Sequence, residues 1–181
     1  MKEQTEEGNV ITISPTDLEC PDSPLRKHSS PVSSITSGVV RLVELMADVL
    51  LNKSTHGTGI SAVQIGVPIR LILLNHARVP GTEIVLVNPV PILVSGRRFV
   101  RREGCLSLPD YHGEVERRDK ISVKSQNLKG EEFAYSTSGY EATVLQHELD
   151  HLDGVLYWDR MDGHKKPKLR CSKEIPDECQ S

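Results

Sequence analysis

Residues 138–154 carry the pattern that most restricts how this chain can fold. Ser138 and Glu141 have the spacing of a helix capping box, and Gly154 stands where a helix commonly ends. The segment "GYEATVLQHELDHLD" between these signals predicts one helix of about four turns. Its apolar residues predict the face that packs against the rest of the protein: Val144, Leu145, Leu149 and Leu152.

Two histidines, His147 and His151, stand four residues apart on this helix, with Glu148 between them. At this spacing the Cβ atoms lie about 5–6 Å apart, so the two imidazoles can bind one metal ion. Glu148 points to the side, where its carboxylate can reach a water molecule on that ion. The alternative is a surface histidine pair with helical salt bridges, because the short pattern also arises by chance.

A catalytic site of the zinc type needs three protein ligands and one open position. Upstream, the best third ligand is Cys105, whose thiolate binds such ions strongly and whose neighbour Gly104 lets backbone approach closely. The alternative for Cys105 is a small buried core residue. An HExxH peptidase would instead take its third ligand downstream, from Asp153, Asp159, Asp162 or His164.

The rest of the chain predicts one more helix and several strands. In "SGVVRLVELMADVLLN" apolar residues recur at helical spacing, and Ser37 can cap its start. Strands are predicted at "IRLILLNH", "EIVLVNP", "PILVSG", "FVRREGCLSLP", "EVERRD", "ISVKSQN" and "EEFAYS", with turns at "DYHG" and "NLKG". We therefore expect an α+β fold in which mixed or antiparallel sheets surround a central C-terminal helix that carries the HExxH motif.

Length and charge narrow the class of protein further. A chain of 181 residues usually forms one domain, which we place at 17–161 between an acidic flexible tail (1–16) and a polar, basic tail (162–181). The formal charge of −3 gives no overall attraction to DNA or to anionic membranes, and no apolar run approaches the ~20 residues of a membrane span. The four cysteines form no CxxC pair, which fits a reducing compartment. We expect a cytoplasmic monomer, while a viral or organellar source is also compatible.

Three separated motifs resemble the peptide deformylase family. They are "GTGISAVQ" at 57–64, "EGCLS" at 103–107 and "QHELDH" at 146–151, in the order and spacing of that family. The similarity extends from about Cys20 to Met161. The resemblance implies a catalytic metallohydrolase domain that removes the N-formyl group from the N-terminal methionine of newly synthesised polypeptides and releases formate.

The resemblance also implies the ligands of one divalent metal ion. They are Cys105, His147 and His151, with water in the fourth position. Fe(II) is the ion usually described for the family, and zinc, nickel or cobalt can occupy the site. The ligand set does not choose among these ions, because histidine and cysteine suit zinc and iron alike.

By the same resemblance, three further residues act in the reaction. The metal-bound water attacks the formyl carbonyl, and Glu148 takes its proton as general base and later passes one to the leaving amine. The side-chain amide of Gln64 and the backbone N–H of Leu106 stabilise the oxyanion together with the metal. For Gln64 the alternative is a structural amide that bonds loop backbone.

The family layout further implies residues that bind the substrate or orient the ligands. Asp150 pairs with an arginine of the strand after "EGCLS", for which Arg117 is the best match and Arg118 the second. Thr58 and Ser61 replace apolar residues of the first motif, and His112 replaces a common arginine, so substrate preference is expected to differ. The substrate-binding residues implied are Gly57, Thr58, Gly59, Gly104, Tyr140, Thr143 and Val144, for which surface turns and plain helix packing are the alternatives.

The C-terminal tail departs from the family pattern. Bacterial members continue into a helix implicated in ribosome docking, but 162–181 contain two prolines and little apolar periodicity. A weak ribosome contact through Lys165, Lys166, Lys168 and Arg170 is one interpretation, and a solvated basic tail is the other. A protein in which the metal only stabilises the fold is the non-catalytic alternative, and it requires a fourth protein ligand.

Overall fold

The computed structural model describes residues 10–12, 22–51, 57–77 and 79–161. The predicted tails therefore lie outside the described residues, apart from 10–12. Within the described part no helix is both long and apolar enough to cross a membrane. The elements are α1 (Ser37–Leu51), β1 (Gly59–Ser61), β2 (Leu71–Leu74), β3 (Ile84–Cys105), β4 (Leu108–Gln126), β5 (Glu132–Ser138) and α2 (Gly139–Leu152), with short 3₁₀ turns η2 (Pro24–Arg26), η3 (Ala62–Ile65) and η4 (Tyr157–Arg160).

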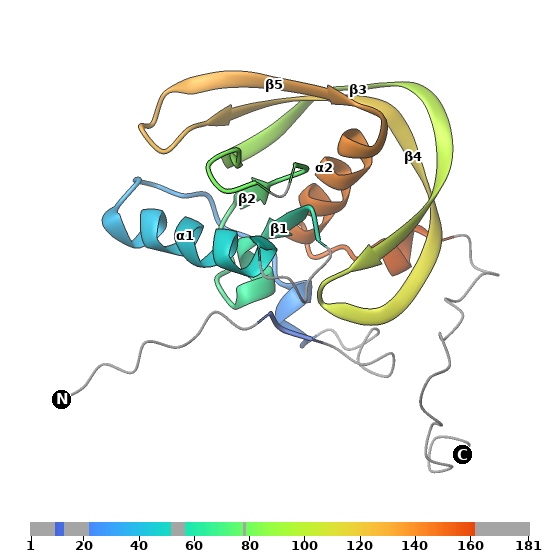
Figure 1. The fold of residues 1–181 in the computed structure, drawn as a ribbon, viewed down its shortest axis with the longest axis horizontal. Helices are drawn as coiled ribbons and strands as arrows, with labels where there is room; N and C mark the ends of the chain where they lie inside the picture. The colour runs from blue at the N-terminus through green and yellow to red at the C-terminus, as the bar shows by residue number, and fades with distance from the viewer. Residues whose placement is uncertain (1–9, 13–21, 52–56, 78, 162–181) are drawn as a thin grey trace, which may run out of the picture.

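The strands form one antiparallel sheet in the order β1-β2-β3-β4-β5, so each strand pairs with its neighbours in sequence. β3 and β4 have 22 and 19 residues, well beyond the usual strand length of about 3–10. Register shifts interrupt their pairing, one of them between Ser95 and Arg98, where Gly96 has φ +81°. Such bulges bend a ribbon, and Figure 1 shows the β3–β4 ribbon curving around α2.

The predicted α+β class with an antiparallel sheet is confirmed. The turn predicted at "NLKG" is present, with Gly130 at φ +81°. The turn predicted at "DYHG" is wrong, because these residues lie inside β4 and the chain reverses earlier, at Leu106 and Ser107. Gly113 serves packing instead, since a Cβ atom there would collide with the sulfur of Met161.

α2 begins after Ser138 as predicted, but its predicted capping box does not form, because the Ser138 side chain makes no capping bond. α1 starts at Ser37, so Ser37 is the first residue of the helix and not the cap that precedes it. Gly139 has φ +66° and turns the chain from β5 directly into the helix, which differs from the approach that a capping box requires. The carboxylate of Glu141 accepts a hydrogen bond from the Tyr135 hydroxyl instead.

The C-terminal end of α2 has the expected glycine stop. Gly154 adopts φ +70°, its N–H bonds the carbonyl of His151 at 3.2 Å, and the N–H of Val155 bonds the carbonyl of Asp150 at 2.9 Å. This pair of bonds is the Schellman arrangement, which satisfies carbonyls that a helix end leaves open. It fixes where the chain leaves the helix that carries both histidines.

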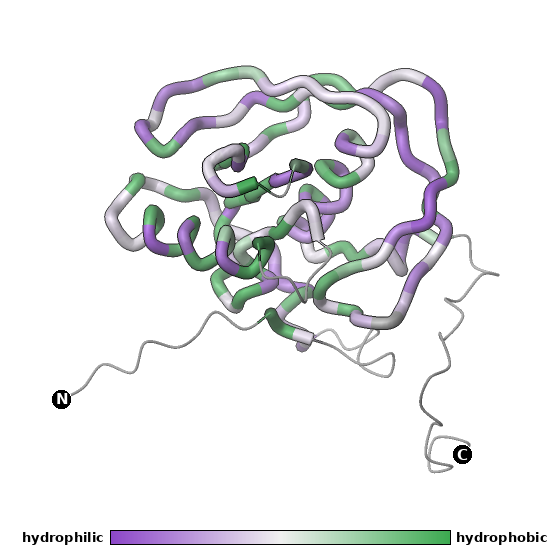
Figure 2. The backbone as a smooth tube through the Cα atoms, viewed as in Figure 1, coloured by the Kyte–Doolittle hydropathy of each residue, from purple (hydrophilic) through white to green (hydrophobic). Residues whose placement is uncertain are grey.

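The packing of α2 is unusual for a helix with so many polar residues. Its apolar residues Leu145, Leu149 and Leu152 join a buried cluster with β2, β3 and β4, as the sequence predicted. Five of its polar residues are buried as well, and Figure 2 shows hydrophilic and hydrophobic residues mixed along this helix. These buried polar residues are Thr143, His147, Glu148, Asp150 and His151. Because buried polar groups need partners, the helix must be surrounded by complementary charges and hydrogen bonds.

The geometry at Gly154 generates a stability prediction. We expect Gly154→Ala to lower the free energy of unfolding by at least about 1–3 kcal/mol, the typical cost of a left-handed non-glycine residue. The cost should exceed that of Gly130→Ala, because a Cβ at Gly154 collides with the Arg26 carbonyl whereas one at Gly130 meets nothing within 4 Å. Urea unfolding of both variants measures the difference, and equal losses would contradict this packing.

Candidate active site

One cluster of potential metal ligands joins the end of β3 to α2. The Sγ atom of Cys105 lies 3.2 Å from Nε2 of His151, and the ligand atoms of Cys105, His147 and His151 all lie within 4.8 Å of one another. A tetrahedral ion with metal–sulfur and metal–nitrogen bonds of about 2.3 and 2.1 Å separates its sulfur and nitrogen ligands by about 3.6 Å. The donor set and its spacing therefore fit one ion.

The position of Cys105 follows from how the hairpin turns. β3 ends at Cys105, the chain reverses at Leu106 and Ser107, and β4 begins at Leu108. The register shifts between Gly104, paired with His112, and Cys105, paired with Leu108. A bulge of this kind re-aims a side chain, and here the thiol lies beside α2.

Glu103 determines the orientation of the His147 ring. Its Oε2 atom lies 2.9 Å from Nδ1 of His147, which leaves Nε2 on the side of the cluster. Burial lowers the pKa of His147, but hydrogen bonds with Cys105 and Glu103 raise it well above its usual value. The same negative groups favour any cation at this place, whether a proton or a metal ion.

The pKa of His151 is shifted in the opposite direction from that of His147. Burial, followed by the positive charge on His147, lowers the pKa of His151 well below the usual value. The ring is therefore neutral at neutral pH and keeps a nitrogen lone pair, which is the form that binds metals.

A buried chain of charges supports the cluster. Arg117 donates to Glu103 from Nε at 2.8 Å and to Asp150 from Nη1 at 2.6 Å. Arg160 donates to both oxygens of Asp150, at 2.8 and 3.1 Å. Burial raises the pKa of Glu103, yet the bonds from His147 and Arg117 bring it below its usual value, so the carboxylate is ionised. Arg118, the second match in the sequence, bonds the carbonyl of Gly96 instead.

Glu148 is buried next to the cluster and is held by a residue from β1. The hydroxyl of Ser61 donates to its Oε2 at 2.7 Å. Burial raises the pKa of Glu148. Gly59 makes room for this carboxylate, because a Cβ there would lie 2.9 Å from Oε1 of Glu148 and 2.6 Å from Cγ1 of Val144.

Hydrogen bonds to its oxygen and from its NH₂ group fix the side-chain amide of Gln64. Its oxygen accepts a hydrogen bond from the backbone N–H of Ser61 at 2.9 Å, which leaves the NH₂ group to face the cluster. That group lies 3.2 Å from the hydroxyl of Ser107 and 3.5 Å from the sulfur of Cys105. A donor in this orientation can bond an oxygen atom placed beside the thiolate.

A cavity of about 630 Å³ lies beside these groups, and Gln64, Glu103, Cys105, His147 and Glu148 line it. At its edge the hydroxyls of Thr58 and Tyr140 lie 3.4 Å apart, which joins the loop before β1 to the start of α2. Leu106 packs on Gly57, where a Cβ atom would be 2.8 Å from the leucine side chain. The sequence-predicted residues that line the cavity are Gly57, Thr58, Gly59, Gln64, Gly104, Cys105, Leu106, Tyr140, Thr143, Val144, His147 and Glu148.

Two of the downstream residues considered as a third ligand are engaged elsewhere. Asp153 accepts a hydrogen bond from Arg70 at 2.7 Å, and Asp159 pairs with Arg26. Neither belongs to the Cys105 cluster. Asp162 and His164 lie outside the described residues, as do Lys165, Lys166, Lys168 and Arg170.

Three residues that shape the site had no role predicted from the sequence: Glu103, Ser61 and Arg160. Glu103 stands in the "EGCLS" motif, so its acidic side chain next to a predicted ligand was a usable signal. Ser61 was noted only as a departure from the family pattern, and Arg160 had no signal in the sequence. Their partners lie 10–87 residues away in the chain.

The fold and the site together indicate the class of enzyme. An α+β protein with a Cys/His/His cluster, a buried carboxylate and an oriented amide around one cavity is typical of a metal-dependent hydrolase. The model of the polypeptide deformylase family matches residues 18–167. The chain belongs to this family and is an enzyme of it. The family is metal-dependent, and the assignment supports deformylation of N-terminal formylmethionine.

Individual relatives agree with the family model. A peptide deformylase of Rhizobium meliloti is 41% identical over 159 residues, which cover 86% of this chain and 89% of the relative. A chloroplastic peptide deformylase 1B of Solanum lycopersicum is 40% identical over 80% of this chain, which spans 52% of that relative's length. Among solved structures, a plant peptide deformylase has a TM-score of 0.78 at 34% identity and covers 91% and 85% of the two chains. The enzyme of Thermotoga maritima has a TM-score of 0.73 at 32% identity and covers 85% and 97%.

The buried charge chain generates a second prediction. We expect Arg117→Ala to cost about 3–5 kcal/mol of unfolding free energy, because it leaves two buried carboxylates short of a partner. Metal affinity should fall about 10- to 100-fold, since His147 loses part of its support. Chemical unfolding and metal titration measure the two effects.

The matched control is Arg98→Ala, which removes an ion pair with Glu116 whose side chains are 62% and 49% exposed. Its cost should stay below about 1 kcal/mol. A loss at Arg117 no larger than the loss at Arg98 would show that the charge chain does not hold the site.

Proposed function

We propose that this enzyme removes the N-formyl group from the N-terminal methionine of newly synthesised polypeptides and releases formate. The observation that carries the proposal is the convergence of Cys105, His147 and His151, of which Cys105 and His147 line one cavity together with Glu148. In this proposal α2 is the central element of the fold, because its HExxH residues supply two ligands and the proton carrier. Nascent formylmethionyl peptides are the partners.

One divalent ion would be held by the thiolate of Cys105 and the imidazoles of His147 and His151. We propose Fe(II), and zinc, nickel or cobalt suit the same donors. Bound there, the ion supplies a Lewis acid that lowers the pKa of water and polarises the formyl carbonyl. Among the described residues the cluster offers three ligand atoms, whereas a metal that only stabilises a fold is usually bound by four protein ligands.

Glu148 moves the proton. Its carboxylate takes a proton from the attacking water as the new C–O bond forms, and it gives a proton to the nitrogen as the C–N bond breaks. Two features support this role: the hydrogen bond from Ser61 holds the carboxylate in place, and burial raises the pKa of Glu148, which makes it a better proton acceptor. The products are formate and a free amine.

Two donors stabilise the oxyanion that forms during the attack. The amide of Gln64 is oriented by Ser61 so that its NH₂ group faces Cys105. The backbone N–H of Leu106, next to Cys105 in the turn, is the second donor. Donors fixed in advance in this way need no reorganisation when charge develops.

The methionine side chain binds against the start of α2. Tyr140, Thr143 and Val144 line the cavity there, and Gly57, Thr58, Gly59 and Gly104 bind the peptide backbone. The pair formed by Thr58 and Tyr140 makes this wall more polar than an aliphatic pocket. Asp150 and Arg117 act through Glu103, which orients His147.

The remaining predictions concern the localisation, oligomeric state and ribosome contact of the enzyme. A cytoplasmic monomer with the domain at 17–161 stays a prediction. So does a weak ribosome contact through the basic tail, whose residues lie outside those described.

Formate release tests the function directly. Protein purified without air and loaded with Fe(II) should release formate from formyl-Met-Ala-Ser, because air oxidises a ferrous ion and a thiolate together. Cys105→Ala should lose most of its metal and its activity, since only two ligands remain. Metal analysis that finds a full equivalent in Cys105→Ala would favour an HExxH peptidase with another third ligand.

The amide of Gln64 gives a second functional prediction. We expect Gln64→Leu to lower kcat about 100- to 1,000-fold, the usual effect of losing one oxyanion donor, with normal metal content. Gln146→Leu is the matched control, because Gln146 bonds the backbone carbonyl of Arg118 at 2.7 Å and does not line the cavity. Turnover that is equal in the two variants would remove Gln64 from the mechanism.

A further inference from the structure

We propose that Arg102 makes this enzyme prefer substrates with an acidic side chain at the second or third residue, directly after the formylmethionine. The inference rests on the proposed function and specifies the substrate class of the same cavity. It depends on where Arg102 lies on β3 and on the charges around it.

Arg102 lies on the wall of the cavity beside the candidate metal ligands. It stands three residues before Cys105 on β3 and lines the cavity together with Gly104 and His112. In the register of the ribbon, Arg102 pairs with Glu114 and Gly104 pairs with His112. Residues two apart on a strand, and residues directly opposite each other, share one face of a sheet. Arg102 and His112 therefore flank Gly104 on one face of the hairpin.

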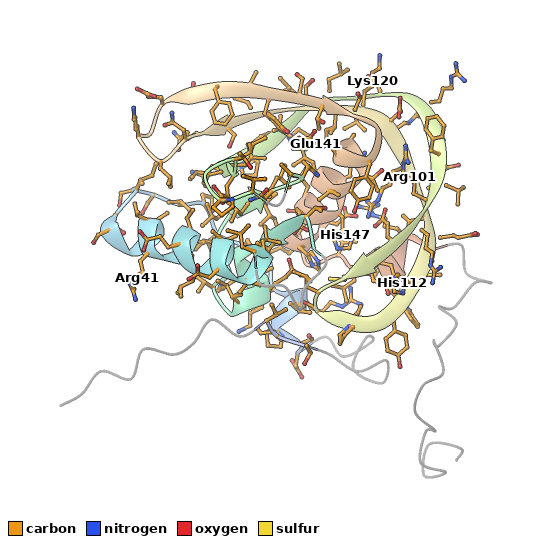
Figure 3. All side chains as sticks on the ribbon, in the orientation of Figure 1. Arg41, Arg101, His112, Lys120, Glu141 and His147 are labelled. Carbon is orange, nitrogen blue, oxygen red and sulfur yellow. The ribbon has the colours of Figure 1, made fainter. Side chains whose placement is uncertain are left out.

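Because Gly104 has no side chain, the backbone of this face is accessible between the side chains of Arg102 and His112. A Cβ atom on Gly104 would lie 3.1 Å from the His112 ring, so the ring covers one side of the glycine closely. Figure 3 shows His112 on the β3–β4 ribbon near its turn, and Figure 2 shows the hydrophilic arm of the ribbon that leads to it. A peptide bound over Gly104 would have the His112 ring on one side and the Arg102 side chain on the other.

Glu114 stands opposite Arg102 on β4, but no ion pair joins these two described residues, so the charge of Arg102 is available to a ligand. A guanidinium stays protonated at any working pH, and none of the ion pairs among the described residues involves Arg102. Other basic residues of the ribbon are engaged, because Arg98 pairs with Glu116 and Arg118 bonds the carbonyl of Gly96. Of the two acids that line the cavity, Glu103 is neutralised by Arg117 and Glu148 is buried next to the ligands.

The reach of an extended peptide decides which substrate residues are affected. Each extended residue spans about 3.3–3.6 Å, so the second and third residues lie within about 10 Å of the methionine. Arg102 stands three positions before Cys105 on the strand, and three strand rises also span about 10 Å. A carboxylate at either position can form a charge-assisted, bidentate hydrogen bond with the guanidinium. Because Arg102 is exposed, the preference should be modest and should weaken in salt.

The test compares matched peptides on the full-length, Fe(II)-loaded enzyme. The kcat/KM values for formyl-Met-Asp-Ser and formyl-Met-Ala-Asp are each divided by that for the corresponding lysine peptide, at low salt and in 0.5 M salt. Formyl-Met-Ala-Ser is the neutral reference, and it reports the proposed function independently of the charge preference. We expect at least one acidic peptide to be favoured about three-fold or more at low salt, and the ratio to approach one in high salt.

Two variants separate a local effect from a general one. Arg102→Glu should invert the ratio in favour of lysine. Arg97→Glu makes the same charge change on the same strand but outside the cavity lining, and it should leave the ratio close to that of the wild type. A wild-type ratio near one at both positions, or an equal change in the two variants, would overturn the proposal.

Binding of the deformylated peptides gives a readout that does not depend on turnover. Calorimetry with Met-Ala-Asp and Met-Ala-Lys should show tighter binding of the acidic peptide, and Arg102→Glu should reverse the order. If no formyl peptide releases formate but this binding order holds, the proposed function fails while the role of Arg102 stands. If formate is released and the order is absent, the role of Arg102 fails.

Discussion

The Glu103 carboxylate joins the strand that supplies the thiol to the helix that supplies the two imidazoles. Glu103 stands two residues before Cys105 on β3, and its oxygens contact His147 on α2 and Arg117 on β4. Taking a carboxylate out of water is costly unless charges and hydrogen bonds replace the lost solvation. Both are present here, so the three elements are fixed relative to one another at the point where the ligands meet. The distance between Cys105 and His151 depends on this junction.

The same junction explains how a helix with many polar residues lies inside the protein. Asp150 is bound by Arg117 and Arg160, and Glu148 is bound by Ser61. The apolar residues of α2 pack against the sheet. Its buried residues His147, Glu148 and Asp150 are bonded by side chains from β1, β3, β4 and η4. Bonds of this kind offset the cost of burying charged groups. The ligands are therefore held by the surroundings of the helix as much as by the helix itself.

Much of the fold could be predicted from local patterns, and most of the site chemistry could not. Apolar spacing located α1 and α2, and Gly154 marked a helix end because only a local dihedral is involved. The turn at "DYHG" was mispredicted because glycine is common in turns, whereas Gly113 is required by packing against Met161. The capping box failed because Gly139 changes the approach to the helix. The bond between Glu103 and His147 joins residues 44 positions apart, and no periodicity encodes such a contact.

We propose that one thiolate and two imidazoles hold a single ion with one position open to substrate. Absorption spectroscopy of the Co(II)-substituted protein, recorded with and without a hydroxamate ligand, tests this site. We expect a sulfur-to-cobalt charge-transfer band that Cys105→Ala abolishes, together with tetrahedral d–d bands that shift when the hydroxamate binds. A spectrum without the sulfur band, or one that the hydroxamate leaves unchanged, would contradict the account.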